Sequence, residues 1–287
     1  MKRVTLAALL LLSTMAGASA ETVLAGHPVT AGLARALTKG TPVVVEAVVP
    51  PAIPMGRQHA FLAGRGGAML AEAARKADAV LTLRSAWAED PLYPLARRAN
   101  IRLIEIDAAR PVDGALPGIA VNDGTAFPWL GIANAGRMAD ILAADLRRLY
   151  PESAGTIDAN LAVLKRGLLM VSSSSARAFA ALPDPSAAAL SDRFATLAAD
   201  LGLDLRRVWT GDDRDWTPDR LAELTATLKA EAIPVVLHHR QPAPEIVRAV
   251  TDGGARLVVL DSLENGPPAE MGMALSRIAE QVEAGLR

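Results

Sequence analysis

The sequence predicts an α/β protein made of two parallel-sheet, Rossmann-like lobes that are joined by a long helix and enclose a ligand cleft. Short β-branched runs alternate with helical stretches in the first half, an Ala/Leu/Arg-rich helical segment follows, and the alternation then returns. Such alternation is typical of βαβ units and parallel sheets. We expect a leader at 1–20, an N-terminal lobe at 21–131, a linking helical segment at 132–182 and a C-terminal lobe at 183–287.

The first residues have the pattern of a secretory signal peptide. Met1-Lys2-Arg3 is basic, residues 6–12 form a short apolar run, and Ala18-Ser19-Ala20 is a small-residue cleavage site. We expect cleavage after Ala20 and a periplasmic protein, because no later run approaches the roughly 20 apolar residues that cross a bilayer. An uncleaved anchor is the alternative, and the shortness of the apolar run disfavours it.

The N-terminal lobe is expected to hold strands at 22–25, 43–49, 79–83 and 102–106, with helices at 29–37, 66–76 and 91–99. Pro50, Pro51 and Pro54 interrupt the chain after the second strand. They predict a long loop at the carboxyl edge of the sheet, where binding residues are often found.

The middle segment is expected to be helical at 132–149 and again at 153–182. The run Ser172–Ser175 falls within helical periodicity, so we interpret it as a solvated part of the second helix. A flexible serine linker is the alternative. A continuous helix is a stiff connector, which predicts limited hinge motion between the lobes.

The C-terminal lobe is expected to hold strands at 186–190, 206–210, 233–237 and 256–260, with helices at 192–201, 218–230, 244–252 and 268–285. Pro218, Pro244 and Pro268 stand at the starts of three of these helices. Proline is well tolerated there, because the first helical turn has no partners for its N–H groups.

Composition excludes several classes of function. The 30 basic and 31 acidic residues leave a net charge of −1, and aromatic residues make up 3% of the chain, so neither a basic footprint nor a stacking surface for nucleic acid is present. The absence of cysteine removes disulfides, thiolate metal sites, cysteine catalysis and a lipid anchor. No Gly-x-Ser-x-Gly motif supports a serine hydrolase built on Ser172–Ser175. We therefore expect a binding protein and not an enzyme.

All four histidines are expected where a strand gives way to a loop: His27, His59, His238 and His239. Ligands of open α/β sheets bind outside the carboxyl ends of the strands, and imidazole is the commonest protein metal ligand. The pattern predicts a metal site. Neighbouring side chains alternate along a strand, so His238 and His239 cannot both point inward if the strand continues past them. Histidines that only cap strand ends are the alternative.

The middle of the chain resembles the metal-type solute-binding proteins of ABC importers (cluster A-I), which include the zinc and manganese receptors. The resemblance rests on Trp129-Leu130-Gly131-Ile132-Ala133-Asn134-Ala135-Gly136-Arg137-Met138-Ala139, on Tyr150-Pro151 and on Ala159-Asn160-Leu161. Phe194, Gly202-Leu203 and Leu260-Asp261-Ser262-Leu263 add to it. It implies a monomeric periplasmic receptor that binds a transition metal, zinc or manganese first, and delivers it to an inner-membrane ABC permease.

The ligand set departs from the family pattern, which the resemblance gives as usually three histidines and a late acidic residue. Phe127 and Ser191 stand where the second and third histidines are expected, and Gly131 replaces the aspartate of the motif. His59 could be the first histidine, although gap-free register favours Leu62. Only Asp261 matches. The candidate metal ligands are therefore His27, His59, His238, His239 and Asp261.

The cleft could instead bind a larger anionic metal chelate, such as a ferric siderophore. Guanidinium groups suit carboxylates and phosphates through forked hydrogen bonds. The candidate residues for such a ligand are Arg57, Arg84, Arg240, Trp129, Phe127 and Ser191. A non-transport metal chaperone or an adhesin on the same scaffold is a further alternative. Met55, Met69, Met271 and Met273 invite a copper site, but core packing explains them better.

Overall fold

The computed structural model describes residues 21–112, 114, 116–120 and 127–287. The expected signal peptide at 1–20 lies outside the described residues. Among those described, no helix combines the length and the apolar character needed to cross a bilayer.

The N-terminal lobe is built on an all-parallel sheet with the strand order β2-β1-β3-β4. Its strands are β1 (Thr22–Ala25), β2 (Val44–Ala47), β3 (Ala79–Thr82) and β4 (Ile104–Asp107). Its helices are α1 (Pro28–Leu37), α2 (Gln58–Ala63), α3 (Gly67–Lys76) and α4 (Leu92–Ala96). Successive residues of β1 enter different clusters: Val23 packs with α1, and Leu24 packs with α3 and α4. Helices therefore cover both faces, as the buried strands require.

The C-terminal lobe repeats this arrangement with the strand order β6-β5-β7-β8, again all parallel. Its strands are β5 (Ser186–Ala189), β6 (Asp204–Val208), β7 (Val235–His238) and β8 (Arg256–Val259). Its helices are α7 (Ala195–Leu201), α8 (Pro218–Ala230), α9 (Pro244–Asp252) and α10 (Met271–Leu286). The prediction of two parallel-sheet α/β lobes is confirmed.

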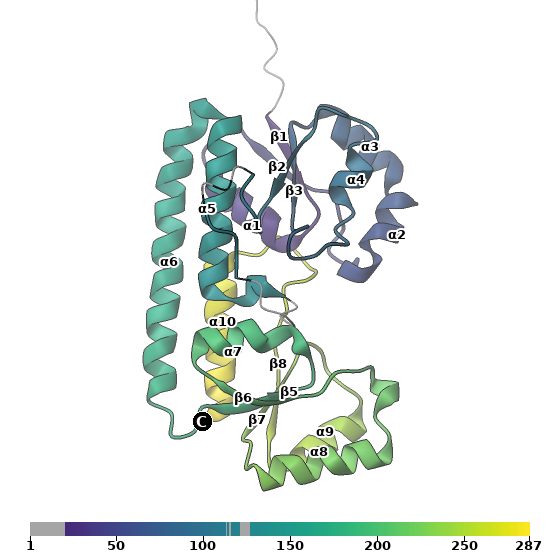
Figure 1. Ribbon diagram of the computed structural model, residues 1–287, viewed down its shortest axis with the longest axis vertical. Coiled ribbons are helices and arrows are strands. Elements are labelled where there is room, and N and C mark those ends of the chain that lie inside the picture. Colours follow the sequence, from purple (N-terminus) through teal and green to yellow (C-terminus); the bar gives the residue numbers. More distant parts are fainter. Residues whose placement is uncertain (1–20, 113, 115, 121–126) are drawn as a thin grey trace, which may run out of the picture.

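Two antiparallel helices connect the lobes. α5 (Ile132–Leu149) packs along α6 (Ala154–Ala180), and α6 runs beside both lobes (Figure 1). The run Ser172–Ser175 is helical, as expected. α10 returns from the C-terminal lobe to pack against α6 and α1. A single buried cluster thus extends from Val23 in β1 to Val282 in α10.

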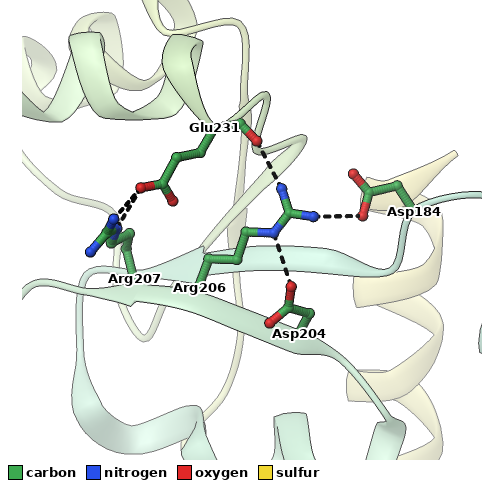
Figure 2. Close-up of polar contacts among 5 residues, drawn as sticks. All are labelled: Asp184, Asp204, Arg206, Arg207 and Glu231. Atoms are coloured by element: carbon green, nitrogen blue, oxygen red, sulfur yellow. Dashed lines mark hydrogen bonds and ion pairs between the residues drawn. The ribbon is translucent and has the colours of Figure 1, made fainter.

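Charged side chains cover the edge of the sheet at β6. Arg206 on β6 donates to the Asp204 carboxylate at 2.9 Å, to the Glu231 carbonyl at 2.8 Å and to Asp184 at 3.4 Å, and Arg207 pairs with the Glu231 carboxylate (Figure 2). Unpaired edge strands can recruit other chains, and charged side chains discourage this. We assign this network a role in protecting the edge, and it lies apart from the strand ends that form the site.

Element boundaries differ from the predicted ones at a few places. β4 begins at Ile104 where a strand was expected from residue 102, and β6 begins at Asp204 instead of 206. The expected loop after β2 contains a short 3-10 turn and the helix α2. His59 therefore lies within a helix, and the prediction that it lies in a loop is wrong. The six residues of α2 were too few to show a clear apolar period.

Candidate site between the lobes

A chain of contacts connects the carboxyl ends of strands from both lobes. His27 follows β1 and packs edge-to-face on Trp129, with the ring centroids 4.6 Å apart. Trp129 in turn packs on Phe127 at 4.9 Å. The Arg193 guanidinium, which follows β5, lies 4.5 Å from the centre of the Phe127 ring. Trp129 also donates from Nε1 to the carbonyl of Ser262 at 3.0 Å, after β8. The predicted cleft between the lobes is thus filled here by aromatic and cationic side chains.

His27 has a structural task at this junction. Its Nδ1 accepts a 3.2 Å hydrogen bond from the backbone N–H of Val29, so it caps the N-terminus of α1. The ring is 2% exposed, and its Nε2 is buried with no hydrogen-bond partner among the described residues. Burial lowers the pKa of His27 to about 3 and keeps the ring neutral. Its role as a metal ligand stays a prediction, and metal binding would require a movement that makes the buried Nε2 accessible.

His238 and His239 lie together at the end of β7. Because the strand ends at His238, the alternation that would separate the two rings does not apply, and their centroids are 4.6 Å apart. Each Nδ1 is buried and has no partner among the described residues. Burial is the largest cause that lowers the pKa of His238 to about 4 and of His239 to about 3. Both rings are therefore uncharged at neutral pH, the form that binds metals.

Arg193 lies in the segment that follows β5, which leaves the sheet beside the end of β7, where the Leu190 N–H donates to the Leu237 carbonyl at 2.9 Å. Its Nε donates to Glu264 at 3.2 Å and its Nη1 donates to the Ser191 hydroxyl at 3.3 Å. After burial, the charge of Arg240 is the next cause that lowers the pKa of His238, and the charge of Arg193 is the next cause that lowers the pKa of His239. Ser191 is 4% exposed, and its hydroxyl also accepts from the backbone N–H of Arg193. The neutral imidazole pair thus lies in the field of two guanidinium groups, Arg193 and Arg240, each held by an ion pair.

Asp261 follows β8 but points its carboxylate at its own loop. The backbone N–H of Leu263 donates to it at 2.8 Å, and the side chain is exposed. This bond stabilises the turn in which Leu263 takes a φ of 54°. The following Glu264, and not Asp261, makes the ion pair with Arg193.

His59 lies exposed on α2, whereas its neighbour Gln58 is buried. Gln58 and His27 line a mainly apolar cavity of about 160 Å³ between the N-terminal lobe and residues 265–268. Within the described ranges, no three His, Cys, Asp or Glu side chains form a group that could hold a metal ion. The five predicted metal ligands are therefore not assembled into one cluster.

Of the predicted chelate residues, the three arginines lie away from the contacts that join the lobes. Arg57 is exposed before α2, Arg84 pairs with Glu105 at 3.1 Å, and Arg240 makes two bonds to Asp213 at 2.8 and 2.7 Å. Phe127, Trp129 and Ser191, in contrast, are brought together around Arg193.

Sequence reasoning missed Arg193, Glu264 and Gln58. The signal for Arg193 was available, since it lies in Ser191-Asp192-Arg193-Phe194, where the resemblance aligns a histidine-containing motif. In that alignment Arg193 stands two residues after Ser191, the position of the lost histidine. The turn at Leu263 brings Glu264 to Arg193, and no motif in the sequence predicts this turn.

Solved structures with the same fold include metal-binding proteins from bacteria. FpvC of Pseudomonas aeruginosa in complex with Mn²⁺ is 16% identical with a TM-score of 0.70, covering 93% of this chain and 97% of that one. A ZnuA structure is 20% identical with a TM-score of 0.70, covering 93% and 100%. A periplasmic metal-binding protein from Candidatus Liberibacter asiaticus is 13% identical with a TM-score of 0.71, covering 93% and 100%.

No curated protein matches the sequence. The family model described as "Zinc-uptake complex component A periplasmic" matches residues 72–280, from within α3 to within α10. This span includes the later half of the N-terminal sheet, both connecting helices and the whole C-terminal sheet. The chain therefore belongs to the zinc-uptake complex component A (ZnuA) family.

Proposed function

We propose that this protein is the periplasmic substrate-binding component of an ABC importer, which binds a transition metal between its lobes and delivers it to the membrane permease. Family membership supports the class of protein. Relatives with the same fold have been solved with Mn²⁺, Ni²⁺ and Zn(II), which makes zinc and manganese the first candidates.

The observation that carries this proposal is the pair of neutral imidazoles at the carboxyl end of β7. His238 and His239 each keep an unpartnered, buried Nδ1 among the described residues. A buried polar atom without a protein partner costs free energy unless a water molecule or an ion satisfies it, and a metal ion would satisfy both rings. Two imidazoles can supply two of the about four N or O ligands that zinc takes, and the other positions fall to further protein groups, water or groups that arrive with the metal.

Equilibrium dialysis of the purified protein against zinc and against manganese, each alone and each with citrate, tests the proposal. We expect about one equivalent of metal per chain in at least one of these forms. The double variant His238→Ala/His239→Ala should lower that affinity at least about tenfold, since two ligands are lost. If the wild-type protein retains no metal in any of the four mixtures, the proposed function is wrong.

Two further variants assess the other predicted ligands. His59→Ala is the matched histidine control, and its exposed position on α2 predicts an unchanged affinity. Asp261→Ala should weaken metal binding if its carboxylate turns from the Leu263 N–H to the metal. An unchanged affinity would remove Asp261 from the ligand set. Stimulation of permease ATPase by the metal-loaded protein would test delivery.

A further inference from the structure

The Arg193 guanidinium is a fixed positive charge at the junction of the two lobes. It is fixed on three sides, by the Phe127 ring at 4.5 Å, by Glu264 at 3.2 Å and by the Ser191 hydroxyl at 3.3 Å. The side chain is 23% exposed and comes from the segment directly after β5. A cation held this firmly is a permanent feature of the site.

The bonds of Arg193 leave one edge of the guanidinium available. Glu264 takes the Nε proton, and Ser191 takes one of the Nη1 protons. Among the described residues, Nη2 donates to no acceptor, so the Nη1–Nη2 edge can still receive a forked pair of hydrogen bonds. That edge is the geometry with which arginine binds a carboxylate.

The segment that carries Arg193 leaves β5 beside the end of β7, which carries both unpartnered imidazoles: the Leu190 N–H donates to the Leu237 carbonyl at 2.9 Å, one residue before His238. A bare divalent ion on these rings would face this fixed positive charge in a partly desolvated site, where like charges repel strongly. An anionic ligand would gain from the same charge.

We propose that Arg193 determines the form in which the metal is bound: the site takes the metal as an anionic carboxylate complex, with a chelator carboxylate on the Nη1–Nη2 edge of Arg193. The chelator supplies most of the metal's ligands, and His238 or His239 completes them. Phe127 stacks on the guanidinium and Glu264 and Ser191 orient it, so the fork is in place before the ligand arrives. This inference rests on the proposed function.

Double-label equilibrium dialysis with radiolabelled zinc and radiolabelled citrate tests the inference on the whole protein. We expect zinc and citrate to be retained together in a one-to-one ratio, and the complex to bind at least about tenfold more tightly than zinc alone. Retention of zinc without citrate, or equal or tighter binding of zinc alone, would overturn the inference and leave the proposed function standing. Retention of neither zinc nor manganese in any form would defeat both.

Variants at position 193 assign the effect to the guanidinium. Arg193→Met keeps the unbranched stem of the side chain and removes the guanidinium, so it should lower the affinity for zinc–citrate at least about tenfold without lowering that for zinc. Arg193→Lys restores charge but not the fork and should recover part of the loss. Arg84→Met is the matched control, because Arg84 pairs with Glu105 and none of its contacts involve the site. Equal zinc–citrate affinity in wild type and Arg193→Met would refute the role; should that variant not fold, the wild-type comparison still decides.

Discussion

At the scale of single residues, burial determines the protonation state of three of the histidines. His27 caps α1 through Nδ1 and packs on Trp129, so the ring cannot take up a proton without losing the cap and exposing a charge to an apolar surround. The same burial keeps the His238 and His239 rings neutral beside Arg193. The chemistry of these histidines is therefore set by what encloses them.

This burial predicts an acid-sensitive contribution of His27 to stability. The folded pKa of about 3 lies below the ordinary value of 6.5, so the unfolded chain binds the proton first and stability falls as the pH drops from 6.5 toward 3. His27→Asn keeps an oxygen acceptor for the Val29 N–H but does not titrate. Between pH 8 and pH 4.5 the wild type should lose about 3 kcal/mol more unfolding free energy than the variant, measured by urea unfolding. Equal losses would show that the ring is not buried as described.

At the scale of elements, the connection between α1 and the loop before α10 is a close backbone contact between the lobes. The Ala269 N–H donates to the Pro28 carbonyl at 3.0 Å, and a Cβ placed on Gly32 would lie 1.8 Å from the Ala269 carbonyl oxygen. The Gly266 N–H also donates to the Pro51 carbonyl at 3.0 Å. The segment 261–270 thus holds the C-terminal lobe against the N-terminal one. Only glycine fits at position 32, where α1 contacts this segment.

Substitution of two helical glycines separates this packing effect from helix propensity. Gly32→Ala forces a methyl group into backbone and should destabilise the protein by at least about 2 kcal/mol. Gly167→Ala in α6 meets nothing within 4 Å and should stabilise it by up to about 1 kcal/mol, because alanine is the better helix former. Urea unfolding monitored by circular dichroism measures both. An unchanged free energy of unfolding in Gly32→Ala would mean that the segment 261–270 moves easily away from α1.

At the scale of the whole molecule, the lobes share one core. The cluster that contains Val23 of β1 also contains Trp129, Phe179 of α6 and Val282 of α10. The Ala133 N–H adds a 3.0 Å bond to Asp200 of α7 across the junction. The expectation of limited hinge motion stays a prediction, and these shared contacts support it.

A shared core predicts that the two lobes unfold together. Tryptophans lie in both halves, with Trp87 and Trp129 near the N-terminal sheet and Trp209 and Trp216 in the C-terminal lobe. Thermal unfolding followed by tryptophan fluorescence and by far-UV circular dichroism should give one coincident transition. Single-tryptophan variants retaining Trp87 or Trp216 should report the same midpoint. Separate midpoints would show that the lobes are energetically independent.

The architecture could be predicted from the sequence. The order of strands and helices, both parallel sheets and the connecting helices follow from apolar periodicity and proline placement, which are local properties of each segment. The sequence also located the histidines at the strand ends, with His59 the exception. Which of these side chains contact one another could be learned only from the folded molecule. The turn at Asp261 presents Glu264, the end of β7 brings His238 and His239 together, and the two lobes close on Arg193, because side chains distant in sequence converge only when the shared core fixes the lobes against each other.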